Sequence, residues 1–183
     1  MRQFTYLLLC IVLISITSCG NCEDKTFQVS DNLLNWLPYS SETPISFSNQ
    51  DNQTLSYTII PDETIRIEDD DECTKTSIQP YIDMQSIDQP DFLTIWFNPK
   101  EGLSNNQLWA IVHENDQIAG SGSISNINDP DSMTESKSLN GIVFDEVISL
   151  NMNGNNSIIK TIYLQKNVGI IGFEYQDSIW VIE

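Results

Sequence analysis

The chain has 183 residues, of which 26 are Asp or Glu and 8 are Lys or Arg, so its net charge is −18. This length fits one domain, and a hydrophobic content of 40% is enough for a core. The acidity argues against a nucleic-acid partner, because few basic side chains exist to replace counterions on phosphates. One His and 4 Cys exclude histidine-rich metal sites and disulfide-dense scaffolds.

The first 18 residues have the pattern of a secretory signal peptide. Arg2 is their only charged residue, and a mostly apolar stretch runs from Phe4 to Ile16. This stretch is shorter than the roughly 20 residues that a helix needs to span a bilayer. We therefore expect residues 1–18 to be a signal that is removed from the mature protein.

The end of this signal, Ile16-Thr17-Ser18-Cys19, resembles the lipobox of bacterial lipoproteins, which are cut just before the cysteine. The resemblance implies that the Cys19 thiol receives a diacylglycerol and that its new amino group is acylated. Two or three acyl chains give a stable membrane anchor. The alternative is a plain secretion signal that happens to end in a cysteine.

The residues that follow Cys19 indicate which membrane is reached. Position 20 is Gly and not Asp, which would favour inner-membrane retention in lipoproteins of the enteric type, and Glu23-Asp24 resembles the export signal of Bacteroidota lipoproteins. We expect a lipid-anchored protein of the outer membrane, on its periplasmic face or on the cell surface. Residues 19–27 are the predicted tether, and residues 28–183 are a single β-rich domain.

Loss of residues 1–18 removes Arg2 and no acidic residue, which moves the net charge by one unit, from −18 to −19. Anionic lipid headgroups repel such a body within a Debye length of about 8 Å. The charge therefore predicts a domain that stands off the membrane on its tether.

Two cysteines remain once Cys10 leaves with the signal and Cys19 carries lipid. Cys22 and Cys73 form an even remainder in an oxidising compartment, which favours a disulfide over two free thiols. Closing a loop of about 50 residues stabilises a fold by about 4 kcal/mol in chain-entropy estimates. The bond would attach the start of the tether to the folded body.

The chain after the tether reads as strands. Only Asp31–Leu37 offers an amphipathic helical turn, which Pro38 ends. The later segments are rich in β-branched and aromatic residues and are separated by turn signals such as Ile60-Pro61-Asp62 and Asn140-Gly141. The candidate strands are residues 45–49, 55–60, 64–68, 76–86, 92–97, 107–114, 117–124, 142–151, 157–164, 168–175 and 178–182.

This spacing predicts an all-β antiparallel meander that forms a small barrel or a sandwich, with at most one short helix. The polar stretch 125–138 reads as a long loop before a C-terminal strand module, residues 139–183. Strands 93–97 and 108–112 are apolar on both faces, which favours a filled barrel with an outer flap or helix over an open sheet. We explain the four tryptophans, Trp36, Trp96, Trp109 and Trp180, by core packing.

The acidic run from Glu68 to Glu72 contains the strongest metal candidates, Asp69, Asp70 and Asp71, whose carboxylates suit calcium. The run lacks the spacing of a dedicated calcium loop, so a solvated loop is the preferred interpretation. Asn128-Asp129-Pro130-Asp131 is a second oxygen-rich segment with the same interpretation. We expect no metal and no cofactor.

Catalytic signals are weak. His113 is the only histidine and ends an apolar strand, and Asp145 and Glu146 are neighbours in a strand, where successive side chains point to opposite faces. Gly120-Ser121-Gly122-Ser123 lacks the third glycine and the following helix of a phosphate loop, so its glycines indicate a bend or close backbone packing. We expect no catalytic residue.

Two tripeptides, Asp131-Ser132-Met133 and Asp177-Ser178-Ile179, resemble the motif that carries O-glycans in exported Bacteroidota proteins. The resemblance implies Ser132 and Ser178 as candidate acceptors. Ser132 is the better candidate because it lies in the long polar stretch.

The C-terminal module, with Leu139-Asn140-Gly141 and Lys166-Asn167-Val168-Gly169-Ile170-Ile171-Gly172-Phe173, resembles the ending of many uncharacterised Bacteroidota outer-membrane lipoproteins. Leu164 departs from that pattern, which usually has a second Tyr there. The resemblance implies a β-rich fold and an envelope location, and it implies no activity. In physical terms, Gly169 and Gly172 lie where a tight hairpin needs backbone freedom or close packing.

The first functional hypothesis is a non-enzymatic, membrane-anchored lipoprotein that binds an envelope protein or glycan or has a structural role. A flat exposed aromatic patch on a filled body would favour binding. The alternative is a lipocalin-like carrier of an apolar ligand, which needs an enclosed cavity. A surface polysaccharide hydrolase is ranked last and needs carboxylates roughly 5–10 Å apart across a cleft.

Overall fold

The structure is a computed structural model that describes residues 24–70, 73–86, 92–99, 106–114, 117–125, 127, 129–153 and 158–183. Cys19 and Cys22 lie outside these residues. The described residues form one sheet of 12 strands with two short helical turns. The predicted all-β, largely antiparallel architecture is therefore confirmed.

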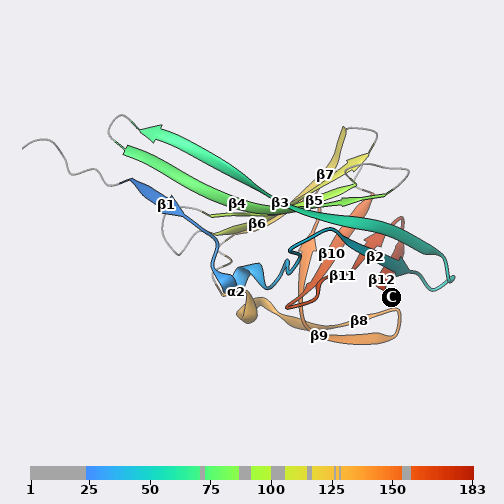
Figure 1. Ribbon diagram of the computed structural model, residues 1–183. Helices are drawn as coiled ribbons and strands as arrows, with labels where there is room; N and C mark the ends of the chain where they lie inside the picture. Colours follow the sequence, from blue (N-terminus) through green and yellow to red (C-terminus); the bar gives the residue numbers. More distant parts are fainter. Residues whose placement is uncertain are drawn as a thin grey trace, which may run out of the picture.

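The elements follow one another along the chain in a meander (Figure 1). They are β1 (Lys25–Phe27), α2 (Asp31–Leu34), β2 (Thr43–Ser48), β3 (Thr54–Asp70), β4 (Cys73–Gln85), β5 (Leu93–Asn98), β6 (Gln107–Glu114), β7 (Gln117–Ser125), the 3-10 turn η1 (Pro130–Met133), β8 (Glu135–Leu139), β9 (Ile142–Asn151), β10 (Ile159–Gln165), β11 (Gly169–Tyr175) and β12 (Ser178–Ile182).

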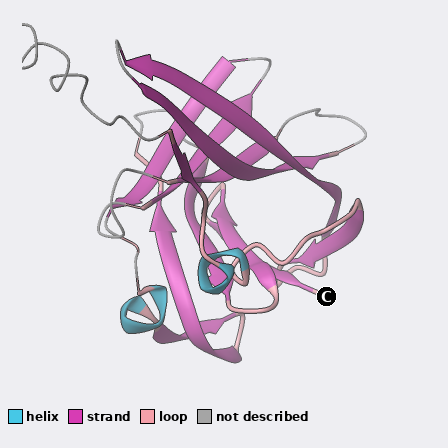
Figure 2. Ribbon diagram, turned by 60° about the vertical axis from the view of Figure 1, so that its left-hand side comes forward, coloured by secondary structure: helices cyan, strands magenta, loops and turns pink. Residues whose placement is uncertain are grey.

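The sheet has the strand order β7-β6-β5-β4-β3-β2-β12-β11-β10-β9-β8, and β1 pairs in parallel with β4. It curls over at β2 and β12, where only Ser48–Val181 and Phe47–Ile182 are in register. The two halves then face each other as two layers (Figure 2). An isolated bridge between Ser121 and Asn153 joins β7 to the end of β9, but the sheet does not close into a barrel.

The core lies between the two layers and is filled by side chains from both. Phe173 of β11 is fully buried, and its ring centroid lies 4.9 Å from that of Phe47 in β2 and 6.2 Å from that of Phe92 before β5. The alternating pattern of β5 sends Leu93, Ile95 and Phe97 into the same core. The space between the layers is thus occupied by packed apolar side chains.

Two sequence expectations about local structure are wrong. Ile60-Pro61-Asp62 is not a turn, because β3 runs through it from Thr54 to Asp70. Pro61 is tolerated there because β2 ends its pairing with β3 at Ile59, so the missing N–H lies on a free edge. The last four residues of the polar stretch 125–138 belong to strand β8, which pairs with β9 around the Asn140-Gly141 turn.

The close approaches expected of the glycines are confirmed. A Cβ added to Gly172 would lie 2.4 Å from the Trp180 carbonyl oxygen on β12, and one added to Gly122 would lie 2.5 Å from the Asn151 oxygen. Any side chain at either position would have to push a backbone strand away. These glycines therefore fix how closely neighbouring strands pack.

The segment after α2 is fastened to the turn between β10 and β11. The Tyr39 hydroxyl accepts a hydrogen bond from the Ile170 N–H at 2.9 Å and donates to the Val168 carbonyl at 3.3 Å. Burial raises the pKa of Tyr39 to about 12, so the hydroxyl keeps its proton at neutral pH. This contact holds the segment after α2 against the layer that contains β10 and β11.

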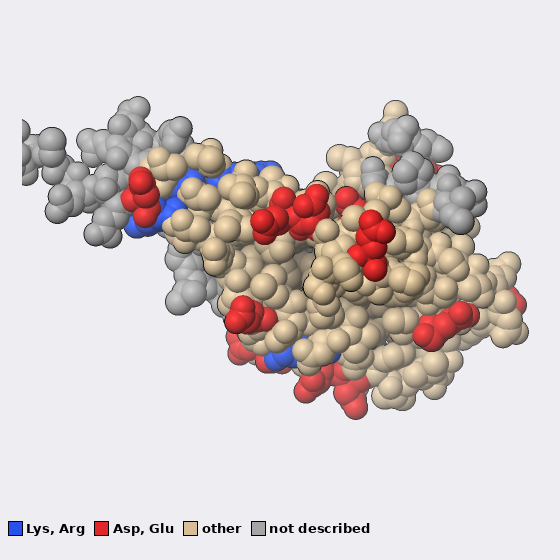
Figure 3. All heavy atoms as spheres, viewed as in Figure 1, with Lys and Arg blue, Asp and Glu red and all other residues tan. Residues whose placement is uncertain are grey.

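The distal half of the β3–β4 hairpin projects beyond the two layers, and β1 lies along it (Figure 1). Lys25, Arg66 and Lys75 lie on this projection together with Asp24, and further acidic side chains are spread over the visible face of the body (Figure 3). Lys25–Phe27, assigned to the tether from the sequence, thus belong to the sheet. Among the described residues, no helix has the length and apolar character needed to cross a membrane.

Candidate functional site

Three aromatic side chains form a row on the outer face of the layer that contains β4, β5 and β6. In β5 and β6 the inward positions are buried and the outward positions are half-buried, which places Trp96 and Trp109 outside. Strand register sets Tyr81 of β4 opposite Trp96, and Trp96 opposite Trp109. We call Tyr81, Trp96 and Trp109 the aromatic face.

The rings of the aromatic face are ordered by their own contacts. Trp96 and Trp109 are stacked, with ring centroids 6.0 Å apart and an interplanar angle of 14°. The Trp109 indole N–H donates to the Gln107 Oε1 at 3.0 Å, and the Tyr81 hydroxyl donates to the Asp62 carboxylate at 2.9 Å. Rings held in this way lose little side-chain entropy when a ligand contacts them.

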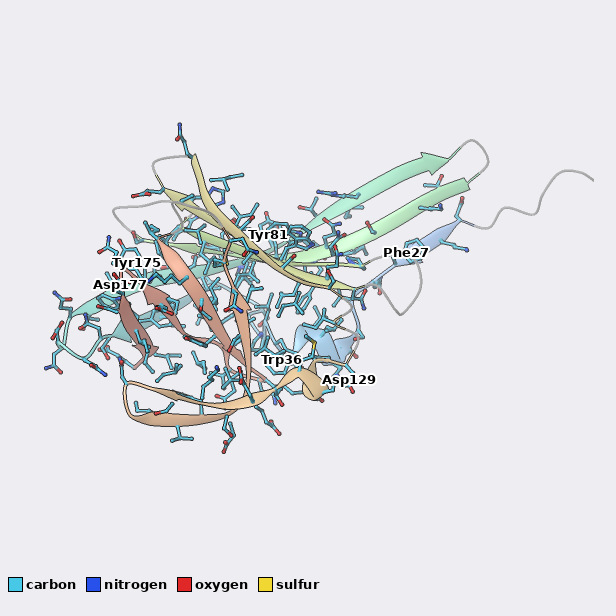
Figure 4. All side chains as sticks on the ribbon, turned by 180° about the vertical axis from the view of Figure 1, so that it is seen from behind. Phe27, Trp36, Tyr81, Asp129, Tyr175 and Asp177 are labelled. Atoms are coloured by element: carbon cyan, nitrogen blue, oxygen red, sulfur yellow. The ribbon has the colours of Figure 1, made fainter. Side chains whose placement is uncertain are left out.

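The explanation of all four tryptophans by core packing is therefore wrong for Trp96 and Trp109. Trp36 and Trp180 are buried, at 1% and 6% exposure, and both belong to the core. Figure 4 shows Trp36 beside α2, beneath the layer that carries Tyr81. Alternation along the strands shows which side chains share a face, but it does not show which face is covered, and no described element covers the aromatic face as the expected flap would.

A row of polar side chains lies next to the aromatic face, two residues away along each strand and on the same side of the sheet. Gln79 faces Asn98, Asn98 faces Gln107, and Gln107 faces Ser125. Gln79 is buried at 5% exposure and donates from Nε2 to the Asn98 Oδ1 at 2.8 Å, and Gln107 donates to the Ser125 hydroxyl at 3.5 Å. We call Gln79, Asn98 and Gln107 the amide row.

A hollow of about 200 Å³ lies where the aromatic face meets the hairpin. Arg66 and Thr64 border it from β3, and Tyr81 and Trp96 border it from β4 and β5. Within the described part of the chain, the Arg66 guanidinium and the Trp96 indole N–H have no hydrogen-bond or ion-pair partner. Two donors are therefore left for a ligand at this hollow.

Two carboxylates flank the aromatic face. Asp62 accepts hydrogen bonds from the Glu63 backbone N–H and then from the Tyr81 hydroxyl, and these bonds lower the pKa of Asp62. Asp83, in the next register row, accepts from the Thr94 hydroxyl at 2.6 Å. The lowered pKa keeps Asp62 charged at neutral pH, so this side of the face is negative.

The residues singled out from the sequence lie elsewhere. Cys73 begins β4, Asp69 and Asp70 end β3, and the side chains of these three are not among the described ones. Cys19, Cys22 and Asp71 lie outside the described residues altogether. Among the residues that the structure does describe, no group of three or more His, Cys, Asp or Glu side chains is placed to hold a metal ion.

The two candidate glycosylation sites differ in exposure. Ser132 lies exposed in η1, where its hydroxyl donates to the Asp129 carbonyl at 2.7 Å. Ser178 begins β12 and is half-buried. Of the two candidate serines, Ser132 is therefore the more accessible.

The weak catalytic signals are not brought together. His113 lies near the end of β6, half-buried, and its backbone N–H donates to the Phe92 carbonyl. Asp145 and Glu146 are both exposed on β9, and Asp145 accepts a hydrogen bond from the Ser136 hydroxyl at 2.6 Å. Glu146 has a φ of 56°, so the strand is irregular there and the two carboxylates are not an alternating pair.

The aromatic face is the candidate binding feature that the sequence patterns did not predict. The signal was present in the alternation of 93–97 and 108–112, which set Trp96 and Trp109 on the face opposite Leu93, Ile95, Leu108, Ala110 and Val112. Comparison with protein-family models, with curated proteins and with solved structures finds no match to this chain.

Proposed function

We propose that this chain is a lipid-anchored, non-enzymatic binding protein of the outer membrane, and that the aromatic face is its binding surface. The observation that carries the binding role is the row of Tyr81, Trp96 and Trp109, which is in register on three strands and partly exposed on a body with a filled core. Large aromatic side chains with few rotatable bonds are the residues that most often dominate binding energy.

The anchor is supported by the sequence and by the position of β1. The lipobox-like Ile16–Cys19 segment lies six residues before β1 begins at Lys25. β1 is paired along the projecting hairpin, so the described chain enters the folded body along that hairpin (Figure 1). A body held by this end presents the outer face of β4, β5 and β6 to its surroundings.

The predicted disulfide between Cys22 and Cys73 is supported by the described neighbours of both cysteines. The Asp24 carboxylate accepts a hydrogen bond from the Thr74 N–H at 3.1 Å, and Lys25 is in register with Lys75. Asp24 is two residues after Cys22, and Thr74 is one residue after Cys73. The chain segments that directly follow the two cysteines are therefore in contact with each other.

We expect the mature protein to resist thiol alkylation until it is reduced. Reduction, or the double substitution Cys22→Ser and Cys73→Ser, should lower the free energy of unfolding by about 4 kcal/mol, because the unfolded chain loses its crosslink. Mass spectrometry after alkylation with and without reductant measures the bond. Cys22→Ser alone is the matched control and should leave Cys73 free to react; alkylation of both cysteines in unreduced wild-type protein would contradict the disulfide.

Site-specific photocrosslinking in living cells tests the binding role. A photoreactive residue at Ser123, which is exposed and opposite Trp109, should give light-dependent adducts, and the same residue at Ile65 should give none. Ile65 is the matched control because it is 56% exposed and lies on the other face of the hairpin, opposite Ile78. The adducts from Ser123 should weaken when Trp109→Ala is added. Equal adducts at both positions would show that the aromatic face is not the binding surface.

A further inference from the structure

We infer that the aromatic face and the amide row together bind an uncharged polysaccharide chain. This inference rests on the proposed binding role and names the ligand class of that same surface. Four features of the described residues carry it: the spacing of the rings, the hydrogen-bonding capacity of the amide row, the hollow with its free donors, and the local charge.

The ring row offers aromatic surface to successive sugar rings. A pyranose presents axial C–H groups on its face, and these carry partial positive charge, which the negative face of an aromatic ring attracts. Tyr81, Trp96 and Trp109 lie on adjacent strands, which are about 4.8 Å apart, so the row extends across the sheet in steps of roughly the size of one sugar. A linear chain of sugars laid across the strands would therefore contact several rings.

The amide row supplies the hydrogen-bond donors and acceptors that sugar hydroxyl groups require. Each primary amide offers an acceptor oxygen and two donor hydrogens, and sugar hydroxyls both donate and accept. Gln79 is more than nine-tenths buried and is held by its bond to Asn98, so these amides are fixed in position before a ligand arrives. Preorganised polar groups bind more tightly because little side-chain entropy is lost.

The hollow of about 200 Å³ is smaller than the pockets of roughly 300–1,000 Å³ that enclose drug-sized ligands. It therefore suits one sugar unit of a longer chain that continues along the open face. The unpartnered donors of Arg66 and Trp96 point to a ligand with acceptor oxygens. The hollow thus lies at the Tyr81 and Trp96 end of the row.

Charge selects an uncharged chain over an acidic one. Asp62 lies in the ring row and Asp83 in the next row, and Arg66 is the one cation among the residues lining the hollow. Lys25 and Lys75 lie farther out on the hairpin, and each has an interaction there. The whole chain carries −18, so a polyanionic glycan would be repelled over distances of about 8 Å, one Debye length. An uncharged polysaccharide incurs no such repulsion.

The test uses the full-length lipidated protein in detergent micelles, with dextran, xyloglucan and galactomannan as uncharged probes and polygalacturonate as an acidic one. We expect at least one uncharged probe to bind and to change tryptophan fluorescence, since two of the four tryptophans lie on the face. Trp96→Ala should weaken that binding about tenfold or more, and Trp96→Phe should restore part of it. Ile65→Ala, on the opposite face of the hairpin, should leave the affinity unchanged.

The outcomes separate this inference from the proposed function. Binding of polygalacturonate alone would overturn the uncharged class. No binding of any probe, together with photocrosslinks from Ser123 to an envelope protein, would overturn the polysaccharide inference and leave the binding role standing. No probe binding and no crosslinks from Ser123 would overturn both. Loss of binding in Ile65→Ala as well as Trp96→Ala would overturn the assignment to this face.

Discussion

Phe173→Ala is expected to lower the free energy of unfolding by about 3–5 kcal/mol, which is a large share of the stability of a single domain. The fully buried ring lies between the two layers, where it contacts Phe47 edge-on at 4.9 Å and lies 6.3 Å from Tyr57. Alanine would remove these contacts and leave a cavity that the surrounding strands cannot fill, because Gly172 already packs against the β12 backbone.

Denaturant unfolding followed by tryptophan fluorescence measures this effect. Val143→Ala is the control, because Val143 is 68% exposed, and its substitution should change the free energy by less than about 0.5 kcal/mol. The loss of free energy of unfolding in Phe173→Leu should lie between those of Phe173→Ala and Val143→Ala, since leucine keeps most of the buried volume. A loss below about 1 kcal/mol for Phe173→Ala would show that the two layers do not meet around this ring.

The C-terminal half illustrates what sequence patterns predict well. The strands at Gln107–Glu114, Ile142–Asn151 and Ser178–Ile182 were predicted with the observed bounds, because apolar alternation and turn residues agree there. Gln176 and Asp177 have φ values of 48° and 63°, as a tight hairpin turn requires. Local sequence and global fold therefore support each other in this part of the chain.

Strands that depend on their partners are harder to predict. Glu135–Leu139 is polar and has no apolar alternation, and it is a strand because β9 offers a partner across the Asn140-Gly141 turn. Lys25–Phe27 is a strand because the long β4 extends past β5 and leaves an edge for it. Such pairing is a property of the assembled sheet, so no window of sequence contains it.

The aromatic face was missed for a related reason. The strands around Trp96 and Trp109 are apolar on both sides, and an apolar side chain on a strand is usually covered. Whether it is covered depends on the elements that the fold places above it. The ring row, the amide row and the hollow come from β3, β4, β5 and β6, and only the register of these strands brings them together.

Cys19→Ala, in a form whose residues 1–18 are replaced by a plain secretory signal, is expected to move the protein from the outer-membrane fraction to the soluble fraction and to abolish labelling by radioactive palmitate. Each buried methylene of an acyl chain contributes about 0.8 kcal/mol to membrane binding, so losing two or three chains removes the attachment. The mature body has one positive charge fewer than the full chain, so its net charge is −19, and anionic lipids repel it overall. Cys22→Ala is the control and should stay in the membrane fraction. Membrane retention of the Cys19→Ala variant, or palmitate label that survives it, would contradict the anchor.

The fold also changes how the anchored protein stands on the membrane. Asp24 is already fixed to Thr74, and the five chain steps from Cys19 to Asp24 reach at most roughly 17 Å. In the proposed lipoprotein, the projecting β3–β4 hairpin is therefore the membrane-proximal end of the body. The paired strands, and not only the tether, then set the distance between the membrane and the rest of the body. Inserting a flexible linker after Cys19 should leave palmitate labelling and membrane fractionation unchanged, because only the acyl chains hold the protein. If such a linker instead releases the protein, attachment depends on contacts of the hairpin with the membrane surface as well as on the lipid.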